Sequence, residues 1–179
     1  MRTASILAAL LALALPTTVT AGKAHVHGVM SLNIALDGTL LSVQLDTPQD
    51  SLVGHERRPR AGAEATAAAA ALALLRDAPR WLRPDAAAGC TPGAVTVVPG
   101  KLEGPAQPGE KDSGHADVAV SVEWRCQTPA ALKGVDVLLF NAFARVERIE
   151  VQVSGLARPA TGLARQRLQR SSSRVRLAG

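Results

Sequence analysis

The sequence predicts an α+β fold, in which a mainly antiparallel sheet is accompanied by one principal alanine-rich helix and one disulfide. Three observations indicate this fold class. Apolar and polar residues alternate with the period of a β-strand in residues 30–45 and again in 117–126, and residues 64–76 between them form an alanine-rich segment with helical periodicity.

Residues 30–45 predict a β-hairpin closed by a two-residue Asp37-Gly38 turn. With that turn, the apolar pairs across the hairpin are Ile34–Leu41, Leu32–Val43 and Met30–Leu45. Extending the first strand backwards places His25 and His27 on its polar face, provided that no bulge interrupts it at Gly28.

The helix is expected over Glu64 to Arg76, with an apolar stripe of Ala68, Ala71, Leu72 and Leu75. Residues 99–114, rich in proline and glycine, are expected to form a surface loop. Further strands are expected at residues 94–98, 117–126, 135–140, 149–153 and 175–177. In the 117–126 strand Val118 to Cys126 alternate inward, which leaves His115 and Asp117 on the polar side.

Residues 1–21 have the features of a signal peptide: Arg2, an apolar run over 6–15 and small residues before the expected cleavage site. The apolar run is too short to span a bilayer. The sequence therefore predicts a soluble, exported, periplasmic protein. One α+β domain is expected over 22–157, followed by an arginine-rich tail over 158–179.

The net charge of +5 owes much to the late arginines, which could in principle contact nucleic acid or an anionic membrane. The chain has no tyrosine and only two phenylalanines and two tryptophans, so few aromatic rings are available to stack on bases. Together with export, this favours a solvated, partly mobile tail that binds no nucleic acid.

Cys90 and Cys126 are expected in an oxidising compartment, where their pairing would close a loop of about 37 residues and stabilise the fold by about 4 kcal/mol. Two free, buried thiols are the alternative.

Histidines predict a metal site. In an extended strand the side chains of His25 and His27 point to one face, and with His115 and Asp117 they would supply three nitrogens and one oxygen to a tetrahedral zinc ion. His55 and Glu56 are reserve ligands. Imidazole also suits copper and nickel. The alternatives are a polar, frayed N-terminal segment and a hydrogen-bonded His115–Asp117 surface pair.

Sequence signatures of enzymes are absent: there is no Gly-x-Ser-x-Gly, no phosphate-binding glycine loop and no His-Glu-x-x-His. The prediction is therefore a protein that is not an enzyme.

Seven short motifs occur in an order and spacing that resembles the ZrgA family of bacterial zinc uptake proteins. They lie at residues 25–28, 33–38, 52–54, 88–90, 115–117, 126–129 and 139–143. The resemblance implies a periplasmic, zinc-binding accessory that assists zinc uptake beside a zinc transporter component. It also implies pairing of the family's two cysteines, here Cys90 and Cys126. A metal-free binding module that recognises an envelope protein partner is the alternative.

The chain departs from the family pattern in two places. Residues 101–114 lack the usual histidine-rich run, so a buffering role for that loop is not expected. Arg57 stands where a histidine is usual, and His55 stands where an aromatic residue is usual.

Overall fold

The computed structural model describes residues 26–104, 114, 116–155 and 164–177. The predicted signal peptide, His25 and His115 lie outside these residues. No helix among the described residues is long and apolar enough to cross a membrane.

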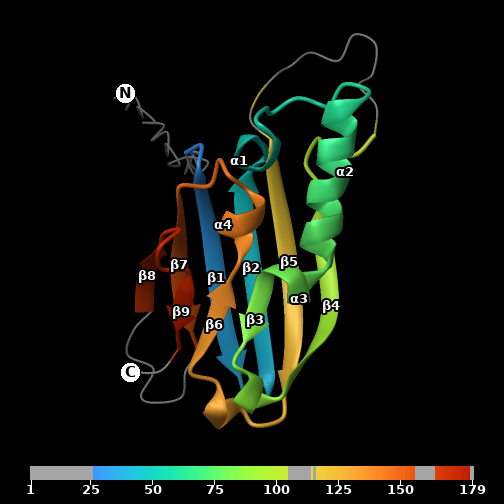
Figure 1. Cartoon of the computed structure of the whole chain (residues 1–179). Helices are drawn as coiled ribbons and strands as arrows, with labels where there is room; N and C mark the ends of the chain where they lie inside the picture. Colours follow the sequence, from blue (N-terminus) through green and yellow to red (C-terminus); the bar gives the residue numbers. More distant parts are fainter. Residues whose placement is uncertain (1–25, 105–113, 115, 156–163, 178–179) are drawn as a thin grey trace, which may run out of the picture.

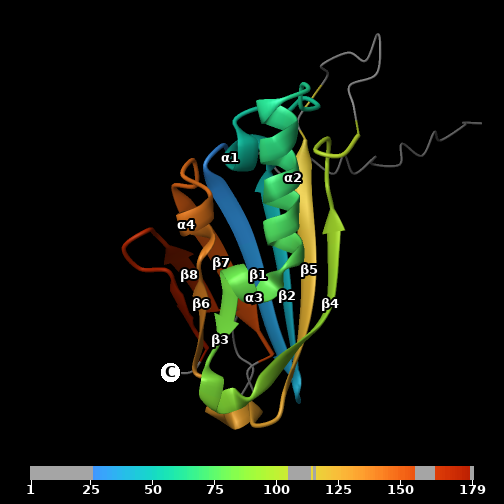
Figure 2. The same ribbon diagram turned by 45° about the vertical axis from the view of Figure 1, so that its right-hand side comes forward.

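The described chain forms two sheets, one of six strands in the order β4-β5-β2-β1-β7-β8 and one of three in the order β3-β6-β9. The small sheet and helices α2, α3 and α4 lie on one face of the large sheet (Figures 1 and 2). The strands are β1 Val29–Asp37, β2 Leu40–Pro48, β3 Leu82–Pro84, β4 Cys90–Val98, β5 Asp117–Cys126, β6 Gly134–Val137, β7 Arg148–Ser154, β8 Ala164–Leu168 and β9 Arg174–Arg176. The helices are α1 Gln49–Val53, α2 Ala63–Arg76, α3 Ala78–Trp81 and α4 Leu139–Ala142, with short 3₁₀ turns at Ala86–Ala88 and Pro129–Ala131.

The α+β fold class is confirmed. Within the described strands β1 and β7 pair in parallel, and every other pairing is antiparallel. The predicted stripe of α2 is also confirmed, because the four residues that the helix buries are Ala68, Ala71, Leu72 and Leu75. Burying a leucine side chain contributes about 2 kcal/mol, so the stripe accounts for the position of α2 on the sheet.

The hairpin register differs from the predicted one by two residues. Asp37 pairs with Leu40, and Ile34 pairs with Val43 and not with Leu41, so Gly38 and Thr39 form the turn. Gly38 has φ 56°, which glycine adopts readily, whereas a turn centred on Asp37-Gly38 would require a positive φ at the aspartate as well. A shift of two residues keeps the same side chains facing inward, so the apolar pattern fits both registers.

The strand predicted over 135–140 is only partly correct. β6 ends at Val137, and Leu139–Ala142 forms the short helix α4. Leu139 and Phe140 are buried in this helix, and an apolar run of this length does not by itself distinguish a strand from a buried helical turn.

The expected solvated tail is wrong for residues 164–177. β8 extends the large sheet and β9 the small one, and Leu168, Val175 and Leu177 are buried. The strand predicted at 175–177 corresponds to β9, whereas the arginines of β8 hid its pattern from the sequence. Whether this segment is a separate unit, as the predicted boundary at 157 implies, stays a prediction.

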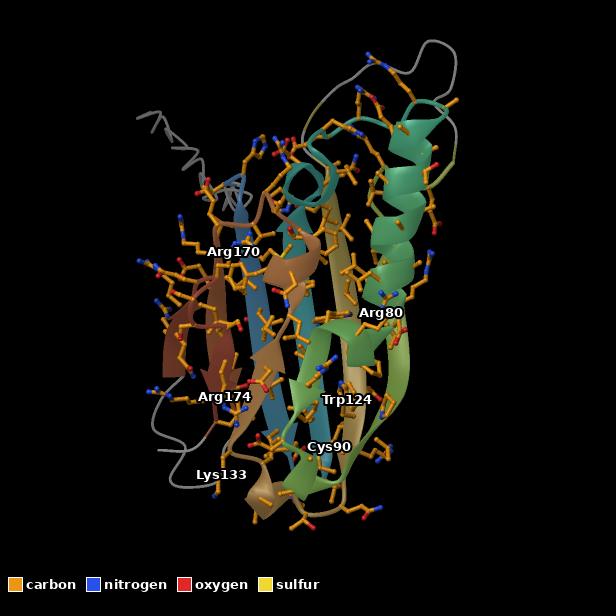
Figure 3. The ribbon with its side chains drawn as sticks, viewed as in Figure 1. Arg80, Cys90, Trp124, Lys133, Arg170 and Arg174 are labelled. Atoms are coloured by element: carbon orange, nitrogen blue, oxygen red, sulfur yellow. A yellow bond between two sulfur atoms is a disulfide. The ribbon has the colours of Figure 1, made fainter. Side chains whose placement is uncertain are left out.

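Two arginines of the C-terminal segment, Arg170 and Arg174, connect it to other parts of the fold (Figure 3). The Arg170 guanidinium donates to the backbone carbonyls of Phe140, Ala144 and Val146, at and just beyond the end of α4. The Arg174 guanidinium donates to the carboxylates of Asp85 (2.5 Å) and Asp136 (3.0 Å). The guanidinium groups of these two arginines therefore form hydrogen bonds within the fold.

The predicted disulfide is confirmed: Cys90 and Cys126 are bonded and are paired residues of β4 and β5. Substituting both cysteines by serine should lower the free energy of unfolding by about 2–4 kcal/mol, because the cross-link restricts the unfolded chain. Urea denaturation of the oxidised protein and the double variant measures this difference. Equal midpoints for the two proteins would contradict the prediction.

Candidate metal centre

Helix α1 lies at the end of the large sheet where β2 finishes and where β1 and β5 begin (Figure 1). Because β1 and β5 both run antiparallel to β2, their first residues meet at this end. Only β2 separates them, so their backbones lie about 10 Å apart, at about 4.8 Å per strand. The His-Val-His-Gly and His-Ala-Asp motifs both adjoin these strand starts.

Helix α1 is hydrogen-bonded to both motifs. The Gly28 N–H donates to Ser51 Oγ (3.0 Å), and the Gln49 N–H donates to the Ala116 carbonyl (2.8 Å). Gln49 and Ser51 are completely buried. This five-residue helix therefore holds two segments that are almost ninety residues apart in the sequence.

The Gln49 side chain organises the loops around this end. Its amide Nε2 donates to the carbonyls of His55 (3.2 Å) and Arg57 (2.7 Å), and its Oε1 accepts from the Lys101 N–H (3.0 Å). Sequence reasoning missed this residue. A helix of five residues is too short to show a period, and a glutamine after Pro48 looks like any polar residue at the end of a strand.

His27 does not continue the first strand. β1 begins at Val29, the Val29 N–H donates to the Val26 carbonyl (3.1 Å), and Gly28 has φ 77°. The expectation of an extended strand through Val26 and His27 is therefore wrong, and Gly28 is where the interruption occurs. After this turn, the ring of His27 lies beside Asp50 of α1.

The His27 ring lies between two carboxylates. Nε2 is 3.2 Å from Glu56 Oε1, and Nδ1 is 3.7 Å from Asp50 Oδ1. The ring is half exposed, whereas the two carboxylates are largely buried. Arg145 Nη2 lies 3.4 Å from Asp50 Oδ2. The sequence singled out Glu56 as a reserve ligand, but nothing in it linked Asp50 to His27.

His55 has a different environment. Its Nδ1 lies 3.0 Å from the Arg57 carbonyl, to which it can only donate, and its Nε2 faces Glu64 Oε2 at 3.7 Å. Arg57 binds the Glu64 carboxylate through two hydrogen bonds, of 2.6 and 2.8 Å. With the Arg60 N–H, this contact lowers the pKa of Glu64 to about 2. The ring thus belongs to the contacts that fix the 55–60 loop on α2.

Asp117 begins β5 with its side chain exposed. No three histidine, cysteine or carboxylate side chains of the described residues converge as a metal cluster. Because His25 and His115 are outside those residues, the predicted ligand set of His25, His27, His115 and Asp117 stays a prediction.

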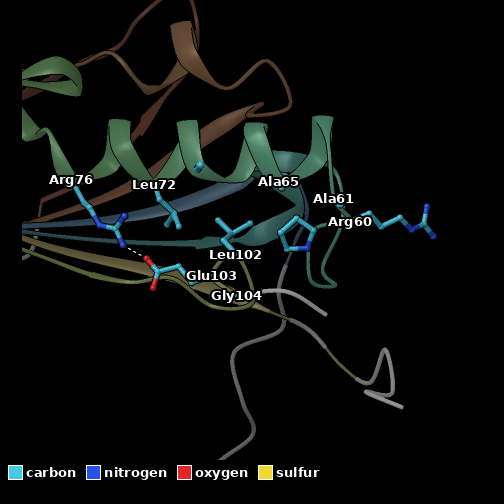
Figure 4. A pocket seen from close by; sticks show the side chains of 10 residues that line it. Arg60, Ala61, Ala65, Leu72, Arg76, Leu102, Glu103 and Gly104 are labelled. Atoms are coloured by element: carbon cyan, nitrogen blue, oxygen red, sulfur yellow. Dashed lines mark hydrogen bonds and ion pairs between the residues drawn. The ribbon is translucent and has the colours of Figure 1, made fainter. Parts of the chain in front are cut away.

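A groove of 680 Å³ lies between α2 and residues 102–104 (Figure 4). Three alanines and two leucines make up half of its lining residues, and its acidic side chain, Glu103, is paired with Arg76. The groove contains no histidine or cysteine, so its chemistry does not suit a transition metal.

Residues 24–177 match the model of a family described as ZrgA family zinc uptake protein, which covers most of the chain. The match extends through β8 and β9, beyond the motifs that carried the resemblance. No curated protein matches the chain.

Substituting Gln49 by leucine should lower the free energy of unfolding by about 2–4 kcal/mol, because two carbonyls and one N–H lose their buried partner. Gln44→Leu, on the exposed side of β2, is the matched control and should change it by less than about 0.5 kcal/mol. Chemical denaturation checks both values, and similar midpoints for the two variants would refute the role of Gln49.

Glu64→Gln should change the pH dependence of stability. The folded pKa of Glu64, about 2, lies below its ordinary value of 4.5, so its contribution is present above pH 4.5 and is lost as the pH falls towards 2. The difference in melting temperature between wild type and E64Q should therefore shrink over this range. Glu123→Gln, at an exposed position of β5, is the control for the loss of a surface carboxylate. A difference between wild type and E64Q that stays constant from pH 4.5 to pH 2 would contradict the role of Glu64.

Proposed function

Because this chain belongs to the ZrgA family of zinc uptake proteins, we propose that it is a periplasmic zinc-binding accessory that assists zinc uptake and catalyses no reaction. The observation that carries the proposal is the position of α1, which is hydrogen-bonded to the His-Val-His-Gly motif at Gly28 and to the His-Ala-Asp motif at Ala116.

The ligand chemistry supports zinc. His27 offers an imidazole at the end of the sheet, and neutral imidazole with carboxylate is a common zinc donor set. We propose that His25 and His115, which adjoin Val26 and Ala116, are further ligands, with Asp117 as the fourth. His55 is a weaker candidate, because the loop contacts already use its ring. Copper and nickel accept the same donors, so the test compares binding of all three metals.

The Cys90–Cys126 disulfide supports an exported protein, since disulfides persist in oxidising compartments. It agrees with the signal peptide expected from the sequence. A transporter component that receives the ion is the partner that this role implies.

The stoichiometry should be close to one zinc ion per chain. The 101–114 segment contains no histidine, so it offers no imidazole for additional ions. A single site suits delivery of individual ions better than storage.

Titrating zinc into chelator-treated protein should give binding near one equivalent by calorimetry. Substituting His25 and His27 together by alanine should weaken it at least tenfold. The affinity should also fall below about pH 6.5, where free imidazole becomes protonated. His55→Ala should retain most of the affinity, because the ring is engaged by the loop.

Absence of both heat and thermal stabilisation with zinc, copper and nickel would contradict the proposal. That result would favour the metal-free module that recognises an envelope protein.

A further inference from the structure

We infer that Asp50 is the carboxylate that shares the metal ion with His27, and that Glu56 is a positioning residue that holds the His27 ring. This inference rests on the proposed function and specifies its site. Asp50 was not among the ligands predicted from the sequence. It lies on α1, the helix that links the two motifs, and in this inference it takes the place of Asp117 as the carboxylate ligand.

The distance between the two donor atoms fits a shared ion. His27 Nδ1 and Asp50 Oδ1 are 3.7 Å apart, too far for a hydrogen bond. Two ligand atoms at the usual 2.0–2.2 Å from a tetrahedral zinc ion are about 3.5 Å apart. An ion can therefore enter between these atoms with little movement of either side chain.

The other ring nitrogen has a different partner. Glu56 Oε1 lies 3.2 Å from Nε2, which is a hydrogen-bond distance, so an Nε2 proton is donated to this carboxylate. That tautomer leaves a lone pair on Nδ1, the ring nitrogen that lies 3.7 Å from Asp50 Oδ1. A metal-bound imidazole usually donates its second N–H to such a carboxylate, which fixes the ring and increases its basicity.

The surroundings of Asp50 fix its position before an ion arrives. Its neighbours Gln49 and Ser51 are buried and hydrogen-bonded, so α1 cannot turn without breaking those contacts. Arg145 contacts Oδ2 (3.4 Å), whereas Oδ1 faces the His27 ring. The Asp50 and Glu56 side chains are 14% and 16% exposed, and a carboxylate attracts a cation more strongly in such surroundings than in water.

The position of Asp117 is less favourable for sharing an ion with His27. Its side chain is exposed at the start of β5, and the end of β2 lies between it and the start of β1. Asp50→Asn should therefore weaken zinc binding more than Asp117→Asn does.

Calorimetry with zinc tests the inference on the full chain. Asp50→Asn should weaken binding at least tenfold. Glu56→Ala should weaken it about tenfold or more, and Glu56→Gln less, because its amide oxygen still accepts the Nε2 proton. Asp46→Asn is the matched control: this exposed carboxylate on the outer side of β2 should leave the affinity unchanged.

Two further measurements separate ligation from structure. Nitrogen NMR of the histidine rings should show zinc on Nδ1 of His27, with the proton on Nε2. Arg145→Gln removes the cation from Asp50 but no ligand, so it should bind zinc at least as tightly as wild type. Melting temperatures of the metal-free variants report on folding.

The outcomes distinguish the two claims. No zinc binding by the wild-type protein would overturn both the proposed function and this inference. Wild-type binding that Asp50→Asn leaves intact would overturn the inference alone. Arg145→Gln weakening binding as much as Asp50→Asn would show that Asp50 acts through the ion pair, and zinc on Nε2 would overturn the role of Glu56.

Discussion

One buried amide organises the end of the molecule at which the metal site is proposed. Three backbone groups from two loops form hydrogen bonds with the Gln49 side chain, and the backbone N–H of Gln49 donates to the Ala116 carbonyl. Irregular backbone has no ladder to satisfy its polar groups, and each buried group left unpaired costs about 1–3 kcal/mol. The loop that carries Glu56 and the loop that carries Lys101 thus depend on a single side chain, whereas the residue before β5 is bonded by the Gln49 backbone. The turn that contains His27 is held by Ser51, whose Oγ accepts a hydrogen bond from the Gly28 N–H.

Much of the fold could be predicted because burial leaves a local period. The alternation of Val118, Val120 and Val122 and the stripe of α2 needed only the geometry of a strand or a helix, and the structure agrees with both. The cysteine pairing required only the compartment and the family pattern. These signals report which face of an element is buried, and they do so independently of its neighbours.

The sequence did not predict which residues and elements lie beside one another. A two-residue slip of the hairpin keeps every apolar side chain inward, so the pattern gave no warning of it. β8 was hidden because arginines alternate with its inward residues. Of the three side chains that meet at the candidate site, the sequence singled out His27 and Glu56 but not Asp50. Asp50 meets His27 solely because β1 and β2 are antiparallel, and the turn at Gly28 redirects the ring.

The Arg57–Glu64 pair affects how an ion would bind to and leave the proposed site. The Arg57 guanidinium binds its loop to α2 through two short hydrogen bonds to Glu64. The lowered pKa of Glu64 keeps both groups of this pair charged at neutral pH. Glu56 is then presented from a loop that is already ordered. In the proposed function, loading and unloading would then require no refolding of this loop, which would suit rapid exchange with a recipient better than long retention.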